Sequence, residues 1–297
     1  MALDPDQLHA LRAVLRLGSF GGAAQELHIT PSAVSQRIKA LEEAVGTALV
    51  LRGQPSTGTA AGRRLAQHAD DIALLEARLV RDLHLPLGDT TTRVRVAVNS
   101  DSLATWFIPA MAASAPLLFD LVLDNQDHTA DWLRRGEVSA AVTVHAKPIP
   151  GCRLVPLGHL TYVATATPAF AARWFANGVD AASLARAPSL TFDTKDDLQR
   201  RWTEQLCGEQ VPSPSHYIPS TQAFLDGALA GLGWCLNPIA LAGDALRDGR
   251  LVALGGGAEL RVPLAWQVSQ IMAPALHDLT EAVVRGAEQL LRDNGRR

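Results

Sequence analysis

Residues 20–52 read FGGAAQELHITPSAVSQRIKALEEAVGTALVLR, and this stretch decides the fold of the N-terminal part of the chain. The residues from Ala23 to Leu27 predict a short helix, which is followed by a turn. Thr30 is a good N-cap and Pro31 suits the first helical position, so a second helix begins here. Gly46 ends that helix, because glycine readily adopts the left-handed conformation found after a last helical turn. The stretch therefore predicts two helices that meet at a tight corner.

The second helix has two different faces. Val34, Ile38 and Leu41 form an apolar face that can pack into a core. The opposite face carries short hydrogen-bonding side chains near the N-terminus, which a helix needs in order to read base edges in the major groove. Basic side chains on this helix and just after it suit phosphate contacts. The candidate DNA-binding residues are Ser32, Ser35, Gln36, Arg37, Lys39 and Arg52. From the pattern alone, an ordinary three-helix structural bundle is an open alternative.

The flanking segments extend this unit. Apolar residues at helical spacing predict an earlier helix that Gly18 closes, and residues 48–59 predict a small hairpin or wing. Residues 60–83 predict a long helix, whose heptad-spaced residues are Leu65, Ile72 and Leu79. Such a stripe favours pairing between two copies of the chain, and packing on its own domain is the alternative.

After residue 88 the sequence changes to short apolar runs that alternate with helical stretches, a pattern typical of a parallel α/β sheet. Candidate strands lie at 93–99, 118–123, 139–144, 160–165, 189–192, 233–236 and 262–269. The chain is thus divided into an all-α DNA-binding unit at 1–59, a linker helix at 60–88 and an α/β unit at 89–297.

Composition and missing motifs narrow the class of protein. The formal net charge of -3 means that any DNA binding comes from a local patch. Three cysteines without CxxC spacing fit reduced thiols rather than disulfides or a zinc site, so we expect no metal. The acidic N-terminus is unlike a signal peptide and no apolar run is long enough to span a bilayer, so we expect a cytoplasmic protein without a membrane partner. The motifs G-x-S-x-G, G-x-x-x-x-G-K-[ST] and H-E-x-x-H are absent, so we predict neither an enzyme nor a cofactor.

The order of residues in the opening stretch closely resembles the DNA-binding segment of LysR-type transcriptional regulators. In that family an AA-x-x-L stretch, a turn, S-x-x-S-Q/R-x-I-x-x-L-E and G-x-x-L-x-x-R follow one another, as they do here. Pro31 is a departure, because many members have a base-contacting glutamine there, and the site preference is therefore not carried over.

The resemblance to this family covers the whole chain and has several implications. It implies an N-terminal winged helix-turn-helix with a long linker helix, joined to a two-lobed α/β effector domain resembling type 2 periplasmic binding proteins. Lobe I would comprise 89–163 and 268–297, and lobe II 164–267. The implied partners are double-stranded promoter or operator DNA, RNA polymerase, a small-molecule effector, and further copies in a homodimer or homotetramer.

Three runs resemble the ArgP/LysG branch of the family more specifically. They are VNSDSLATWFIPAM at 98–111, LRRGEVSAAVTV at 133–144 and TPAFAARWFANGV at 167–179. This resemblance implies an effector that is L-lysine or L-arginine, and target genes that include a basic amino-acid exporter.

Polar residues near the predicted strand ends are the candidate effector-binding residues. Hydroxyls and backbone N–H groups where a strand gives way to a helix, at Ser100 to Ser102, would suit an α-carboxylate. A cationic side chain needs carboxylates, and threonines would complete the pocket. The full candidate set is Ser100, Asp101, Ser102, Asp124, Asp127, Thr143, Asp193 and Thr221. Each aspartate fits equally well as a helix cap or a solvated turn residue. A LysR-type regulator with a different effector, an α/β enzyme, a transport-type binding protein and a nucleoid-type architectural role are the alternative functions.

Overall fold

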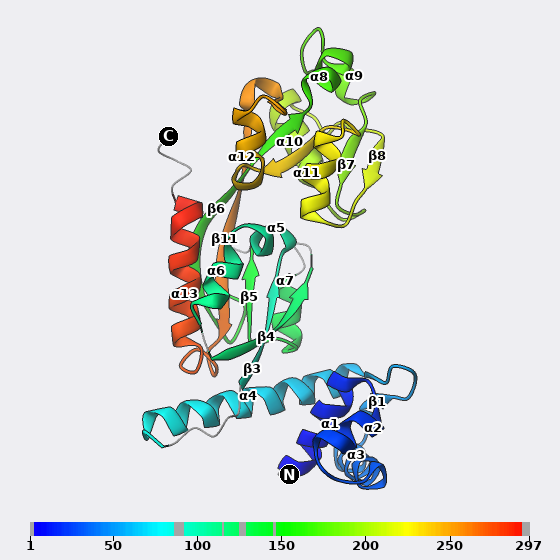
Figure 1. Ribbon diagram of the computed structural model, residues 1–297, viewed down its shortest axis with the longest axis vertical. Coiled ribbons are helices and arrows are strands. Elements are labelled where there is room, and N and C mark those ends of the chain that lie inside the picture. Colours follow the sequence, from blue (N-terminus) through cyan, green and yellow to red (C-terminus); the bar gives the residue numbers. More distant parts are fainter. Residues whose placement is uncertain (1–2, 86–91, 115, 125–128, 145–146, 293–297) are drawn as a thin grey trace.

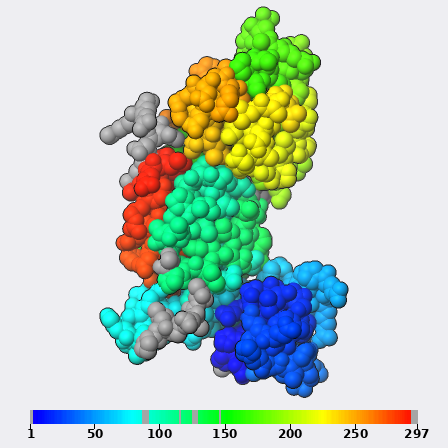
Figure 2. All heavy atoms as spheres, viewed as in Figure 1, coloured from blue at the N-terminus to red at the C-terminus, as the bar shows by residue number. Residues whose placement is uncertain are grey.

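The computed structural model describes residues 3–85, 92–114, 116–124, 129–144 and 147–292. Three units follow one another along the long axis of the molecule (Figures 1 and 2). A small helical module lies at one end, the first lobe of an α/β domain lies in the middle, and the second lobe lies at the other end. The helix α4 (Ala60–Asp82) runs between the module and the first lobe.

The N-terminal module is a three-helix unit with a wing, formed by α1 (Pro5–Leu17), α2 (Phe20–Glu26), α3 (Pro31–Val45), β1 (Val50–Leu51) and β2 (Thr57–Gly58). The predicted caps of α3 are confirmed: the Thr30 side chain accepts a hydrogen bond from the backbone N–H of Ala33, and Gly46 is left-handed at φ 80°. The predicted wing is an antiparallel pair of strands. The core of the module is formed by the apolar faces of its helices, including Leu11, Val14, Val34, Ile38 and Leu41.

Helix α4 divides its apolar residues among three environments. Leu65, Ala69 and Ile72 pack on the core of the N-terminal module, so the first half of the predicted stripe is used within the chain. Leu74 is buried in the core of the α/β domain. The remaining leucines are exposed to 37%, 57% and 58%, and they are Leu75, Leu79 and Leu83.

The α/β domain is organised around one seven-stranded sheet. In lobe I, β3 (Thr92–Val98) lies between β4 (Leu117–Leu123) and β5 (Ala140–Thr143), and the three strands are parallel. Two long strands, β6 (Cys152–Ala166) and β11 (Glu259–Ser269), then continue the sheet in antiparallel pairing. The sheet is therefore mixed rather than parallel, because the two long strands cross between the lobes in opposite directions. The lobe I helices are α5 (Ser100–Ser102), a π-helical turn (Leu103–Phe107), α6 (Ile108–Ala112), α7 (Thr129–Arg135) and α13 (His277–Ala287).

Strands β6 and β11 join the two lobes (Figure 1). β5 pairs with β11 only as far as Ala265, and β9 (Cys235–Pro238) first pairs with β6 at Tyr162. Between these points, from Gly158–Leu264 to Thr161–Arg261, β6 and β11 pair with each other. We call this segment the crossover ribbon. It begins at a register shift between Leu264 and Ala265.

Lobe II is a second α/β unit. A parallel pair of strands, β7 (Ser189–Thr191) and β8 (Ser215–Tyr217), accompanies β9 and β10 (Val252–Ala253), and both of the latter pair with β6. The helices of lobe II are α8 (Pro168–Trp174), α9 (Ala181–Leu184), α10 (Leu198–Cys207), α11 (Thr221–Leu229) and α12 (Ile239–Arg247). Trp202 and Trp234, both fully buried, stack at 5.4 Å within this lobe.

Candidate functional site

The first candidate surface is the outward face of α3. Ser32, Gln36 and Lys39 are exposed and Ser35 is partly exposed, whereas Val34 and Ile38 are buried. The polar side chains thus face solvent at the N-terminal half of the helix, in the position that groove reading requires.

The three basic residues predicted for phosphate contact each have a partner within the chain. An Arg37 nitrogen lies 2.9 Å from a carboxylate oxygen of Asp6, and Lys39 Nζ lies 3.6 Å from the Glu43 carboxylate. The Arg52 guanidinium lies 5.4 Å from the centre of the Phe20 ring. All of these contacts are at the surface, where ion pairs contribute little, so the cations can exchange partners at low cost.

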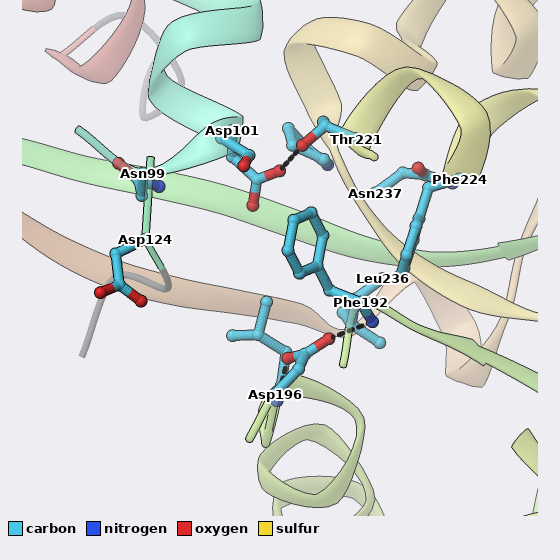
Figure 3. A pocket seen from close by; sticks show the side chains of 12 residues that line it. Asn99, Asp101, Asp124, Phe192, Asp196, Thr221, Phe224, Leu236 and Asn237 are labelled. Carbon is cyan, nitrogen blue, oxygen red and sulfur yellow. Dashed lines mark hydrogen bonds between the residues drawn. The ribbon is translucent and has the colours of Figure 1, made fainter. Parts of the chain in front are cut away.

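The second candidate site is a cleft between the lobes (Figure 3). On the lobe I side it is lined by residues that follow β3 and β4, namely Asn99, Ser100, Asp101 and Asp124. β3 and β4 are parallel with Val98 opposite Leu123, so their carboxyl ends bring these residues together. The lobe II lining consists of Phe192, Asp196, Leu198, Thr221, Phe224, Leu236, Asn237 and Pro238. Three carboxylates therefore face one cleft, and the described residues that line it include no lysine, arginine or histidine.

Asp101 connects the two lobes directly. Its Oδ1 accepts a hydrogen bond of 2.7 Å from the hydroxyl of Thr221 at the start of α11, and its Oδ2 accepts one of 2.5 Å from the hydroxyl of Tyr162 on β6. Burial raises the pKa of Asp101, and the two donated hydrogen bonds oppose that rise because they favour the charged form. The same burial, together with the adjacent Asp101 charge, raises the pKa of Tyr162.

Asp196 and Asp124 are held by other donors. Asp196 accepts backbone N–H bonds of 3.0 Å from Phe192 and 3.1 Å from Leu198, which fix the turn after β7. Burial raises the pKa of Asp196, and these two bonds oppose the rise. Asp124 accepts a bond of 2.9 Å from the indole N–H of Trp132.

Two amide oxygens in the lining lack a partner. Oδ1 of Asn99 and Oδ1 of Asn237 are buried without a hydrogen bond from any described residue. The amide nitrogen of Asn237 is already used, since it donates to Thr165 Oγ1 at 2.9 Å and to the Cys235 sulfur at 3.2 Å. A buried acceptor without a donor is costly, but both oxygens are enclosed by protein and are not exposed to the cleft.

The structure brings together four of the eight residues predicted for effector binding, namely Ser100, Asp101, Asp124 and Thr221. Ser102 and Thr143 are fully buried and lie outside the lining, and Thr143 accepts a hydrogen bond from Gln267. Asp193 also lies outside the lining, because its carboxylate accepts the backbone N–H groups of Lys195 and Asp196. Asp127 falls outside the described residues.

Sequence reasoning missed Asp196, Asn237 and the aromatic residues of the cleft. The signal for Asp196 was present, because it follows a predicted strand by only a few residues, but the choice between Asp193 and Asp196 depends on how the turn folds back. The thiol of Cys235 behind Asn237 is fully buried, and burial raises its pKa to about 12, so it is not a nucleophile. Across the described ranges, no group of three or more His, Cys, Asp or Glu side chains is arranged to hold a metal ion, and no helix has the length and apolar character needed to cross a membrane.

Comparison with known families gives matches over both parts of the chain. Residues 5–63 match the bacterial regulatory helix-turn-helix protein of the lysR family, and residues 88–288 match the LysR substrate binding domain. The chain is 41% identical over 295 residues to the HTH-type transcriptional regulator LysG of Mycobacterium tuberculosis, which covers 99% of this chain and 97% of the relative.

Two full-length solved structures are similar to the chain. The crystal structure of ArgP from Mycobacterium tuberculosis superposes with a TM-score of 0.81 at 41% identity, covering 97% of this chain and 99% of that one. Full-length LysG from Corynebacterium glutamicum with bound effector Arg superposes with a TM-score of 0.67 at 36% identity, again covering 97% and 99%.

Proposed function

The chain belongs to the LysR family of bacterial transcriptional regulators, and we propose that it controls transcription by sensing a basic amino acid in the interlobe cleft. It is a DNA-binding regulator of the LysG/ArgP kind and not an enzyme. The proposal concerns the identity of the effector, the residues that bind it and the genes controlled, which include an exporter of basic amino acids.

One observation carries the choice of effector: three carboxylates line the cleft, with no basic residue among its described lining. Such a site offers many acceptors and few donors, so it suits a ligand rich in N–H groups and positive charge. L-Arginine has a planar guanidinium with five donors and an ammonium with three. The apolar lining, which includes Phe192 and Phe224, suits the methylene stem between these groups. The bound arginine of the Corynebacterium glutamicum relative agrees with this reasoning.

Calorimetric titration tests the effector. We expect L-arginine and L-lysine to bind, and L-citrulline not to bind, because citrulline has nearly the shape of arginine but a neutral urea group. Binding of citrulline as tight as that of arginine would show that charge does not drive recognition. Absence of binding by both basic amino acids would refute the proposal.

A pair of variants tests the binding residues. Asp196→Asn removes a charge from the cleft, whereas Asp193→Asn removes one three residues away, outside the lining. We expect the first to weaken arginine binding at least tenfold and the second to leave it within twofold, since a lost charge-assisted hydrogen bond costs about 1.5–3 kcal/mol. Weaker arginine binding by Asp193→Asn than by Asp196→Asn would instead assign the contact with the effector to Asp193.

For DNA we propose that α3 reads base edges through Ser32, Ser35 and Gln36, while Arg37, Lys39 and Arg52 contact phosphates. Gln36→Ala is expected to cost about 1–3 kcal/mol in binding to the specific duplex and almost nothing in binding to random DNA, because only base contacts carry sequence information. Gln25→Ala, on the exposed face of α2, is the matched control. Unchanged specific affinity of Gln36→Ala would count against the reading helix.

The exposed leucines of α4 support a homodimer, which two-fold related DNA half-sites also favour. We propose that Leu75, Leu79 and Leu83 pack against the same residues of a second copy, and that dimers associate further into tetramers that recruit RNA polymerase.

A further inference from the structure

Helix α4 is bound to lobe I of its own chain by a buried polar cluster. Ser139, which immediately precedes β5, donates a 2.7 Å hydrogen bond to Asp71 on α4. Gln67, one turn earlier on α4, donates to both Asp71 and Ser139 at 2.9 Å. Gln67 is 3% and Ser139 is 1% exposed, so the triangle of hydrogen bonds lies inside the contact. Burial raises the pKa of Asp71, and the bonds from Ser139 and Gln67 oppose the rise.

A buried carboxylate that pairs with two partly exposed arginines lies beside the triangle. Glu137 is 2% exposed, and its carboxylate contacts Arg63 of α4 at 2.8 Å and Arg135 of lobe I at 3.1 Å. We call Arg63, Arg64, Gln67, Asp71, Glu137 and Ser139 the polar dock. Arg64 contributes by donating a hydrogen bond of 2.8 Å to the backbone oxygen of Gly136, and a Cβ on Gly136 would lie only 1.3 Å from the Arg64 guanidinium. The position of the Arg64 guanidinium therefore depends on the absence of a side chain at Gly136.

Ser139 is also tied to the two strands that lead to the cleft. Its backbone N–H donates to the oxygen of Arg95 on β3, and its own oxygen accepts from Ser269 at the end of β11, both at 3.0 Å. β3 ends at Val98, directly before the cleft residues, and β11 crosses to lobe II through the crossover ribbon. A change in the angle between the lobes therefore reaches Ser139 through continuous strands.

The same segment of α4 faces the DNA-binding module. Asp70, the neighbour of Asp71, lies 3.4 Å from Arg12 on α1, and its side chain is 13% exposed. α4 thus contacts lobe I through Gln67 and Asp71 and contacts α1 through Asp70, all within two turns of one helix.

We propose that the polar dock is the contact through which occupancy of the cleft alters DNA binding. This inference rests on the proposed function of the cleft. Buried polar groups must keep their partners, so α4 moves with Ser139 instead of sliding past it. The dock is therefore a positioning device: it touches neither effector nor DNA, and it makes the orientation of the DNA-binding module depend on the state of the lobes.

Linkage provides the test, because a coupling between two ligands changes the affinity for each by the same factor. The DNA probe is a duplex that the wild-type protein enriches from fragmented genomic DNA, and the effector probe is L-arginine. The dissociation constant for arginine is measured by calorimetry with and without saturating duplex, and that for the duplex by anisotropy with and without arginine. For the wild-type protein we expect the two ratios to agree, at roughly 5- to 150-fold.

Ser139→Ala and Arg64→Ala open the contact from its two sides. Each is expected to bind arginine alone and DNA alone within about twofold of wild type, while the coupling ratio falls to roughly one. Ser189→Ala is the matched control, since Ser189 is equally buried, at 1% exposure, but lies in lobe II away from α4, and it should retain the full ratio. Arg64 is on the surface, so its variant remains informative if Ser139→Ala fails to fold.

The outcomes distinguish failure of the proposed effector from failure of the proposed role of the polar dock. Failure of the wild-type protein to bind either basic amino acid removes the proposed function. Binding of arginine with no effect on DNA affinity, or full coupling in both Ser139→Ala and Arg64→Ala, overturns the role of the polar dock while leaving the effector assignment intact.

Discussion

Replacing Thr221 with valine should open the two lobes. Valine keeps the shape of threonine and removes the hydroxyl, which donates the 2.7 Å hydrogen bond to Asp101 across the cleft. A hydrogen bond to a charged acceptor contributes about 1.5–3 kcal/mol. The bond joins the lobes only when they are closed, so its whole contribution acts on the equilibrium between closed and open forms. At 1.4 kcal/mol per factor of ten, the open-to-closed ratio should rise roughly 10- to 140-fold.

The distance between the lobes can be measured by double electron–electron resonance. Spin labels are placed on cysteines introduced at Ala113 in lobe I and at Asp244 in lobe II, which are both exposed. Cys207 is replaced by serine, because the other two native thiols are buried. We expect Thr221→Val to move the distance distribution of the effector-free protein towards longer separations.

A matched variant separates opening of the lobes from general destabilisation. Thr203 is fully buried in lobe II. Its hydroxyl donates a hydrogen bond to the backbone oxygen of Arg200 and accepts one from the backbone N–H of Val211. Thr203→Val should lower the melting temperature without shifting the interlobe distance. If Thr221→Val gives the distance distribution of the wild-type protein, the bond to Asp101 does not hold the lobes and the reasoning is refuted.

Three further predictions concern other parts of the chain. Leu79→Lys should dissociate the proposed dimer in analytical ultracentrifugation, while Leu232→Lys, at a leucine that is 49% exposed on lobe II, should not; equal association in both would remove the proposed α4 interface. Burial raises the pKa of Asp70 from 3.8 to about 6, so its stabilising contribution is present below pH 3.8 and is lost as pH rises through 6. Urea denaturation should therefore show the unfolding free energy of the wild-type protein falling by about 2.5 kcal/mol relative to Asp70→Asn between pH 3.8 and pH 7, and parallel curves would contradict this. The carboxylate of Asp196, whose pKa burial raises, must be ionised to attract a cation, so the affinity of the wild-type protein for arginine should fall as the pH is lowered. The fall should be smaller in Asp196→Asn, and identical pH profiles of the two proteins in calorimetry would count against this role of Asp196.

The N-terminal module was predictable because its signals are local. The N-cap at Thr30, the proline at Pro31 and the glycine at Gly46 act within a few residues of where they stand, and the structure confirms each of them. The apolar periodicity of α4 was also visible in the sequence, but the surface against which each apolar residue packs was not. Leu65 and Ile72 pack on the chain's own module, whereas Leu79 is exposed, and heptad spacing cannot distinguish these two uses.

The cleft was less predictable because it forms from residues far apart in the sequence. Asp101 and Thr221 are 120 residues apart, and only the crossing of β6 and β11 brings them within hydrogen-bonding distance. β6 itself was predicted to start at residue 160, but it begins at Cys152. Pro156 and Gly158 lie at the register shift opposite Ala265 and Leu264, where irregular backbone is accommodated without ending the strand.

The crossover ribbon sets the kind of movement that the lobes can make. Two-stranded ribbons twist more readily than wide sheets, and twisting changes the inclination of the lobes while every backbone hydrogen bond along the pair is kept. A loop hinge would allow large translations, whereas this connection permits mainly a rotation about its own axis. A small rotation near Leu160 displaces the end of α4 in proportion to its distance from the ribbon axis, so a ligand needs to displace the cleft walls only slightly to redirect the DNA-binding module.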